Sequence, residues 1–265
     1  DLRGRVVAFG GRILVDGESK YLNCPESPVL HKGEMLYNLH AAKQAIRKDE
    51  TAIVVEGYFD TIRLVLAGVE NVVAPLGTSL TDRQAALLRK FAPTVIVLYD
   101  SDAPGLRAAF RAADELLRHG VRVRVATLPD DEDPDSLVAT KGVEALRQVL
   151  HDAEDVIELK IGMLERKGWF ADVEHRREAL DRLLPTIRAA SDPITRELYL
   201  STVAERAKVS REVLQAELEK RTDAQTHGRS GGGSSDRGSS GRPDHPSMRP
   251  SDPASVRPSV RASLR

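Results

Sequence analysis

The chain of 265 residues is long enough for one large domain or two smaller ones, each with a hydrophobic core. Charged residues are 30% of the chain but nearly cancel, to a formal net charge of -1, and aromatic residues are only 4%, which argues against aromatic stacking as the main binding device. The single cysteine, Cys24, excludes an internal disulfide framework and a cysteine-rich zinc site within this sequence. No apolar run approaches the roughly 18 residues of a membrane span, and no signal peptide is visible, so we expect a cytoplasmic protein without a membrane partner.

The first part of the chain, residues 1–48, is predicted to be α+β. Apolar residues at 5–9 and 12–15 predict two strands, with Gly10 and Gly11 as the turn between them, and residues 20–23 predict a further extended segment. An amphipathic helix is predicted over about residues 33–48. Because the sequence starts with Asp1 in the middle of a strand-like pattern, we expect it to be a fragment of a longer protein.

Strands and helices alternate in the next part of the chain. Strands are predicted at 51–55, 72–74, 94–99 and 121–127, and the helices between them at 60–67, after the capping pair Thr81 and Gln84, and at 105–119. This alternation is typical of βαβ units and predicts an α/β fold with a mainly parallel sheet and flanking helices.

From residue 143 onward the pattern becomes purely helical and then loses its apolar residues. Helices are predicted at 143–151, 153–167, 173–189, 193–207 and 210–220, with Ser210 as an N-cap, and they are expected to form a small bundle behind the sheet. Residues 222–265 are rich in Gly, Ser, Pro and Arg and predict a disordered linker, since too few apolar side chains remain to offset the entropy of ordering.

Acidic residues follow three of the predicted strands. Glu56 and Asp60 follow the first, Asp100 and Asp102 follow the third, and Asp133 and Asp135 lie after the last. Ligands bind beyond the carboxyl ends of parallel strands, so these side chains are expected to share one pocket. Clustered carboxylates repel one another unless cations neutralise them, and Mg²⁺ prefers oxygen ligands. The sequence therefore predicts a divalent metal site, and two such ions can clamp a phosphoryl displacement.

Some of these acids have simpler explanations. Asp60 stands at the opening of a helix, where a carboxylate is favourable without any metal. Asp130, Asp131 and Glu132 are expected to form a solvated acidic loop. The sequence contains no phosphate-binding G-x-x-x-x-G-K-[ST] loop, which argues against a P-loop nucleotidase.

Four motifs, taken in order, carry a family resemblance. They are Val55-Glu56-Gly57-Tyr58-Phe59-Asp60, Leu76-Gly77-Thr78-Ser79-Leu80-Thr81, Tyr99-Asp100-Ser101-Asp102, and residues 128–137, Leu-Pro-Asp-Asp-Glu-Asp-Pro-Asp-Ser-Leu. Together with Val7-Ala8-Phe9-Gly10-Gly11-Arg12 and Lys20-Tyr21-Leu22-Asn23, they resemble the catalytic core of bacterial DNA primase, the DnaG family, whose central unit is a TOPRIM module. The resemblance covers about residues 1–221.

The resemblance implies roles for individual residues. Glu56, Asp100 and Asp102 match the catalytic, metal-binding carboxylates, and Asp60, Asp133 and Asp135 match the supporting acids around a further ion. The basic groove that binds template and nucleotide is matched by Arg12, Lys20, Asn23 and Lys32. It further implies four parts: the end of the N-terminal subdomain (1–48), the TOPRIM subdomain (49–142), a helical subdomain (143–221) and the linker (222–265).

The implied activity is metal-dependent synthesis of short RNA primers on single-stranded DNA, from ribonucleoside triphosphates, at bacterial replication forks. Mg²⁺ or Mn²⁺ is the expected cofactor, and zinc is expected only in a module absent from this chain. The replicative helicase is expected to bind a C-terminal domain that is also absent. The usual Asp-Gly-Asp is here Asp100-Ser101-Asp102. Two alternatives stay open, a TOPRIM-type nuclease and a non-catalytic fragment that binds nucleic acid.

Overall fold

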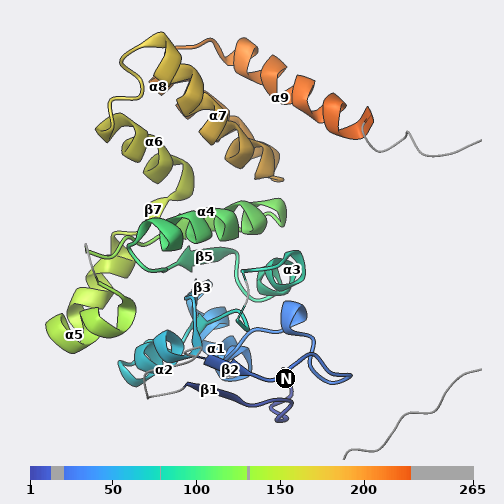
Figure 1. The fold of residues 1–265 in the computed structure, drawn as a ribbon, viewed down its shortest axis with the longest axis vertical. Helices are drawn as coiled ribbons and strands as arrows, with labels where there is room; N and C mark the ends of the chain where they lie inside the picture. The colour runs from blue at the N-terminus through green and yellow to red at the C-terminus, as the bar shows by residue number, and fades with distance from the viewer. Residues whose placement is uncertain (13–20, 78, 130–131, 228–265) are drawn as a thin grey trace, which may run out of the picture. The chain divides into compact units, whose positions relative to one another are not determined.

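The computed structural model describes residues 1–12, 21–77, 79–129 and 132–227, and residues 1–223 form one compact unit. Its centre is a five-stranded sheet, shown in Figure 1, with the order β4-β3-β5-β6-β7. The strands are β3 (Thr51–Val54), β4 (Val72–Val73), β5 (Thr94–Val97), β6 (Arg122–Val125) and β7 (Glu154–Asp155). The first four are parallel, and only the edge strand β7 is antiparallel. The predicted, mainly parallel sheet is therefore confirmed.

Both faces of the sheet are buried, because alternate residues of each strand point to opposite sides. Val54, Val95 and Val97 belong to one apolar cluster, whereas Ile53 and Ile96 belong to the other. The first cluster includes residues of α1 (Leu39–Asp49), α3 (Asp82–Arg89) and α4 (Ala103–Arg118), and the second includes residues of α2 (Tyr58–Leu66) and α5 (Pro134–His151). The helices thus form one layer on each face.

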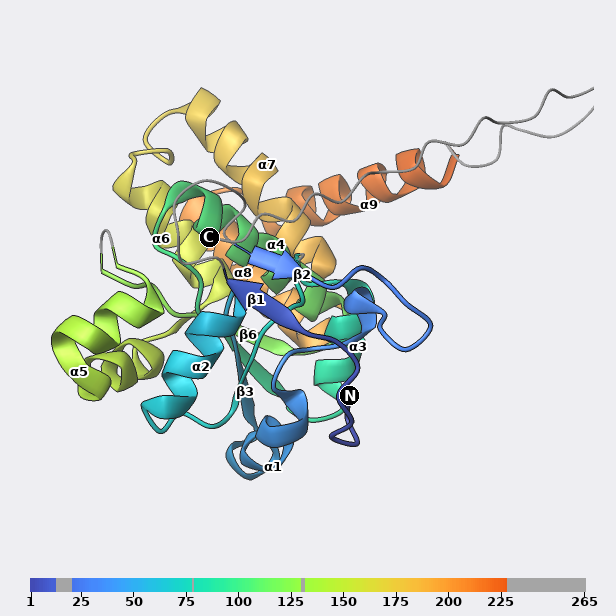
Figure 2. The ribbon, with the colours of Figure 1, turned by 60° about the horizontal axis from the view of Figure 1, so that its bottom comes forward.

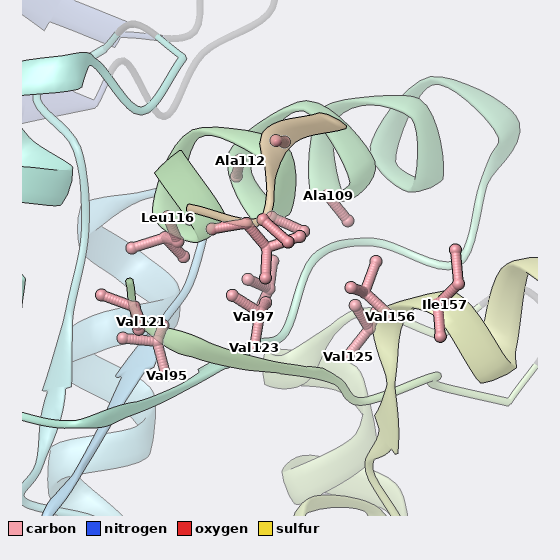
Figure 3. Packing of buried hydrophobic residues seen from close by; sticks show 14 of the residues in the cluster. Val95, Val97, Ala109, Ala112, Leu116, Val121, Val123, Val125, Val156 and Ile157 are labelled. Atoms are coloured by element: carbon pink, nitrogen blue, oxygen red, sulfur yellow. The ribbon is translucent and has the colours of Figure 1, made fainter. Parts of the chain in front are cut away.

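Helix α4 covers the centre of the sheet. Figure 3 shows Ala109, Ala112 and Leu116 directed at the valines of β5 and β6. These positions recur at helical spacing, so small and large apolar side chains line the face of α4 that meets the strands. The acidic end of β5 and the first turn of α4 are therefore anchored by a well-packed core.

The C-terminal helices extend this core. They are α6 (Val156–Arg166), α7 (Val173–Ala189), α8 (Pro193–Ala207) and α9 (Arg211–His227), and the apolar residues of α6, α7 and α8 join the cluster that contains α4. In Figure 1, α6, α7 and α8 lie at the end of the sheet unit next to α4. The predicted bounds of α7 and α8 are confirmed, and Ser210 Oγ accepts a 3.4 Å hydrogen bond from the Val213 N–H at the start of α9. Among the described residues, no helix has the length and apolar composition needed to cross a membrane.

The N-terminal segment forms a two-stranded antiparallel ribbon, β1 (Gly10–Arg12) and β2 (Tyr21–Asn23). The prediction of a strand at 5–9 followed by a Gly10–Gly11 turn is wrong, because both glycines pair with β2 and belong to the strand. The strand predicted at 12–15 lies mostly outside the described residues. The helix predicted to begin at residue 33 starts later, after a 3-10 turn η1 (Lys32–Glu34), because Asn38 has a φ of 65° and Tyr37 bridges to Ala74.

Three further boundaries differ from the predictions. The helix predicted at 143–151 is confirmed as the second part of α5, and a first part that was not predicted starts at Pro134, after the cap Asp133, and ends at the break made by Gly142, whose φ is 81°. The edge strand β7 was not predicted, since two polar residues carry no strand periodicity. Residues 222–227, assigned to the linker, instead continue α9. The remainder of the predicted linker lies outside the described residues.

Candidate metal centre

Glu56 and Asp100 stand at neighbouring strand ends. Strands β3 and β5 pair in parallel with Val54 opposite Val97, so the two chains leave the sheet side by side. The backbone N–H of Asp100 lies 3.4 Å from Glu56 Oε1 and donates to it. Partial burial raises the pKa of the Glu56 carboxyl group, although the residue as a whole is exposed, and the charges of Asp100 and Asp102 raise it further.

The turn after β5 holds Asp102 directly before the first residue of α4. Asp102 is the N-cap of this helix, and its Oδ1 accepts a 2.6 Å hydrogen bond from the Gly105 N–H. A Cβ atom on Gly105 would lie 2.5 Å from the Asp100 carbonyl oxygen, so only glycine allows the turn to close this tightly. Ser101 Oγ donates to the Glu132 carbonyl oxygen across 3.2 Å and ties this turn to the third acidic segment.

Asp60 belongs to the same acidic group and also caps its own helix. Its Oδ2 accepts a 3.1 Å hydrogen bond from the Gly57 N–H at the start of α2. Burial raises the pKa of Asp60 to about 7, with further contributions from the charges of Asp100, Asp133 and Glu56. Asp60 therefore stabilises the start of α2, as the helix-start interpretation predicted. Its carboxylate also interacts electrostatically with Glu56, Asp100 and Asp133.

Asp133 and Asp135 have different surroundings. Asp133 caps α5 by accepting a 2.6 Å hydrogen bond from the Ser136 N–H, and its charge raises the pKa of Asp100, whose largest shift comes from burial. Asp135 instead forms an ion pair with the guanidinium group of Arg63 on α2. Asp135 thus has a cationic partner, whereas Asp133 adds to the repulsion among the strand-end acids.

The acidic loop is described only in part. Hydrogen bonds from Ser136 and Lys141 lower the pKa of Glu132, and its side chain is only 17% exposed, so the expectation of a solvated carboxylate is wrong for this residue. Asp130 and Asp131 lie outside the described residues.

Five carboxylates therefore interact electrostatically at one edge of the sheet, namely those of Glu56, Asp60, Asp100, Asp102 and Asp133. Burial and mutual repulsion raise the pKa values of Glu56, Asp60 and Asp100, and a divalent cation with oxygen ligands offsets this repulsion. The donor set is of the kind that Mg²⁺ or Mn²⁺ prefers.

The residues predicted to contact nucleic acid are only partly described. Asn23 lies on β2 and Lys32 in η1, and both line a groove of about 760 Å³ that also contains Gly10 and Tyr58. Arg12 is placed in β1 by its backbone alone, and Lys20 lies outside the described residues. Asn23 Oδ1 accepts a 2.7 Å hydrogen bond from the Tyr58 hydroxyl, a contact that sequence reasoning missed.

A second group of acids and a histidine lies elsewhere. Candidate ligand atoms of Asp82, Glu115 and His119 fall within 4.8 Å of one another. Glu115 is 13 positions from the capping residue Asp102, which places it roughly 20 Å away along α4. His119 Nε2 lies 2.7 Å from Asp82 Oδ1, and Glu115 pairs with Arg118, so ordinary ion pairs account for this group.

Three family models match the chain. Residues 50–127 match the Toprim domain, residues 1–43 match the N-terminal domain of the DNA primase catalytic core, and residues 160–212 match the DnaB-helicase binding domain of primase. The last match corrects the expectation that helicase-binding sequence lies only beyond this chain, because it covers α6, α7 and α8.

The chain is similar to known DNA primases in sequence and structure. It is 39% identical to a DNA primase of Halalkalibacterium halodurans over 81% of its own length and 36% of the relative. The chain thus spans well under half of that curated relative. A DNA primase domain from Pseudomonas aeruginosa has a TM-score of 0.75 at 36% identity, covering 83% of this chain and 70% of that one. A DnaG primase catalytic domain bound to ssDNA has a TM-score of 0.71 at 33% identity, covering 80% and 68%.

Proposed function

Because the chain belongs to the DnaG family of DNA primases, we propose that it is the core of an enzyme that makes short RNA primers on single-stranded DNA. The proposal rests mainly on one structural observation. Carboxylates from three separate segments gather at the carboxyl edge of a parallel sheet, and burial and neighbouring charges raise the pKa values of Glu56, Asp60 and Asp100. Such a site is favourable when divalent cations neutralise it.

In the proposed site, Glu56, Asp100 and Asp102 hold the ions, and Asp60 and Asp133 add negative charge around them. Divalent ions bound there would supply the positive charge that nucleotidyl transfer needs at the attacking hydroxyl and at the departing pyrophosphate. The chain's own residues orient the carboxylates that would bind the ions. The N-cap bond fixes Asp102, and the Asp100 N–H holds the Glu56 carboxylate.

The groove beside this site is the proposed path of template and nucleotide. Lys32 and Asn23 line it, and β1 places Arg12 on the same ribbon as Asn23. Cations in such a groove suit the phosphate groups of both ligands, because phosphate contacts position a nucleic acid without reading its sequence. The family match over residues 160–212 supports a replicative helicase as a partner at the replication fork.

Incubation with a single-stranded DNA template, labelled ribonucleoside triphosphates and Mg²⁺ or Mn²⁺ tests the proposal. Template-dependent RNA products that disappear when EDTA is added are expected. Cleavage of the DNA without incorporation would identify a nuclease instead. Binding of DNA without either reaction would leave this chain as a non-catalytic fragment.

A further inference from the structure

Tyr58 connects the ribbon of the groove to the acidic strand end. It is the first residue of α2 and stands two positions after Glu56. Its hydroxyl donates a 2.7 Å hydrogen bond to Asn23 Oδ1 on β2. Figure 2 shows the ribbon β1–β2 beside α2. Residues 35 positions apart in the sequence are thus joined in the lining of the groove.

The Tyr58 ring rests on the ribbon where a glycine makes room for it. Gly10 lies opposite Asn23 in the β1–β2 pairing. A Cβ atom on Gly10 would lie 2.8 Å from Tyr58 Cε2, closer than real Cβ contacts allow. The ring centroid of Tyr37 lies 4.9 Å from that of Tyr58. The ring is therefore held between Tyr37 and the ribbon, so its hydroxyl has little freedom to leave Asn23.

Asn23 is confined from its other side as well. A Cβ atom on Gly77 would lie 2.7 Å from Asn23 Nδ2, so the amide occupies space that only a glycine leaves open. Gly77 also has a φ of +72°, a conformation that glycine adopts without strain. The Tyr58 hydroxyl is the donor in its bond to Asn23 Oδ1, because an amide oxygen can only accept.

We propose that Tyr58 is a positioning residue that fixes the Asn23 amide relative to Glu56, so that Asn23 Nδ2 is presented to the triphosphate of the incoming ribonucleotide. The inference rests on the proposed primase function. With Oδ1 occupied by the tyrosine, the amide group offers its N–H donors, which suit phosphate oxygens. Tyr58 itself acts through Asn23 and touches no reacting atom.

The test is steady-state primer synthesis by Tyr58→Phe, Asn23→Ala and the double variant. Loss of one hydrogen bond is worth about 1 kcal/mol, so the KM for ribonucleotides is expected to rise roughly fivefold in Tyr58→Phe. The kcat is expected to stay within about twofold, since Tyr58 touches no reacting atom. The double variant is expected to match Asn23→Ala, because Tyr58 acts only through Asn23.

Tyr37→Phe is the matched control, since it removes a hydroxyl from the ring packed on Tyr58 and is expected to leave KM unchanged. Gly10→Ala is a second variant. It displaces the Tyr58 ring from the ribbon and is expected to reproduce the KM of Tyr58→Phe. Additive effects of Tyr58→Phe and Asn23→Ala would overturn the inference. So would a change in template affinity alone, or a lowered Tm with an unchanged KM.

Binding of a fluorescent ATP analogue in the presence of Mn²⁺ separates this inference from the proposed function. If the unmodified chain makes no primer but binds the analogue, the primase proposal fails for this chain. The role of Tyr58 is then tested by comparing the dissociation constants of the analogue for the same variants. If the chain neither makes primer nor binds the analogue, both are overturned.

Discussion

The backbone N–H of Asp100 donates to the carboxylate of Glu56 across 3.4 Å, although the two residues are 44 positions apart in the sequence. The parallel register of β3 and β5 produces this contact, because Val54 lies opposite Val97 and both chains leave the sheet at the same edge. A buried sheet thus brings two negative side chains together and orients one of them through a backbone donor.

Asp102 has a structural and a proposed catalytic role, which two substitutions separate. Asp102→Ala removes the cap on Gly105 and is expected to cost about 1 kcal/mol of stability. Asp102→Asn keeps a good N-cap and is expected to retain stability. Both are expected to lower primer synthesis by about 100-fold or more, because a ligand charge is lost. Urea unfolding and template-dependent incorporation measure the two effects, and normal primer yield from Asp102→Asn would exclude the catalytic role.

Removal of a single charge from the proposed metal centre is expected to stabilise the metal-free protein. Burial and neighbouring carboxylates disfavour ionised Asp100, so Asp100→Asn relieves repulsion. A ligand at 100 times its Kd stabilises a fold by about 2.7 kcal/mol, so saturating Mg²⁺ is expected to raise the Tm of the unmodified chain and not that of Asp100→Asn.

Thermal unfolding with Mg²⁺ and with EDTA checks this expectation. Asp135→Asn is the comparison, because Arg63 already pairs with that carboxylate. Its Mg²⁺-dependent rise in Tm is expected to exceed that of Asp100→Asn. The opposite order would place Asp135 among the principal ligands.

Gly105→Ala is expected to disrupt the proposed metal centre without removing a carboxylate. The new Cβ atom would meet the Asp100 carbonyl oxygen at 2.5 Å and Asp102 Oδ1 at 2.9 Å, so the turn must open. Loss of the Mg²⁺-dependent rise in Tm is the expected result. Gly162→Ala on α6 is the control, since its Cβ would only touch the end of Arg166 at 3.5 Å. That substitution is expected to stabilise the chain by up to about 1 kcal/mol, because alanine favours helix over glycine.

Lys160 joins three helices and is expected to be costly to replace. Its Nζ lies 3.3 Å from Asp114 Oδ1, hydrogen-bonds Thr186, and sits 4.7 Å from the Phe110 ring centroid. Lys160→Met leaves Asp114 largely buried without its cation and is expected to cost about 3 kcal/mol in urea unfolding.

The double variant Lys160→Met with Asp114→Leu is expected to recover part of this loss, because no unpaired charge then stays buried. The exposed Lys167→Met serves as control and is expected to change stability by less than about 0.5 kcal/mol. Equal costs for Lys160→Met and Lys167→Met would contradict the buried-pair explanation.

Asp155 is expected to make the free energy of unfolding depend on pH. Burial raises its pKa above the ordinary value of 3.8, and hydrogen bonds from the Ile157 N–H and the Tyr199 hydroxyl lower it in part. The folded chain therefore holds the proton at a pH where the unfolded chain has released it. The resulting stabilisation is complete below the ordinary pKa and is lost as the pH rises through the raised one.

Asp155→Asn keeps the oxygen acceptor but does not titrate. The decline of unfolding free energy as the pH rises above 3.8 is therefore expected to be shallower in this variant than in the unmodified chain. Asp49→Asn, at an exposed position, is the control and is expected to leave the slope unchanged. Urea unfolding at several pH values checks the prediction, and equal slopes for Asp155→Asn and the unmodified chain would refute it.

Local patterns in the sequence determined the α/β fold and the edge of the sheet that carries the acids. Apolar runs that end in Glu56 and Asp100 indicate buried parallel strands, since such strands are continuous apolar segments and their carboxyl ends share one edge. The helices 173–189 and 193–207 were predicted with their observed bounds, because the capping residues Asp172 and Asp192 stand directly before them in the sequence.

Only the tertiary structure decided which side chains pair across the chain. Nothing local to Asp135 indicates Arg63, and nothing local to Asn23 indicates Tyr58. Gly10 and Gly11 have the composition of a turn, yet they pair in β1, where Gly10 makes room for the Tyr58 ring. Periodicity and caps report on neighbours within a few residues, whereas these contacts depend on how distant segments dock. The sequence therefore determined the strands that carry the acids, and the docking of α2 on the ribbon and on α5 decided which polar groups stand beside them.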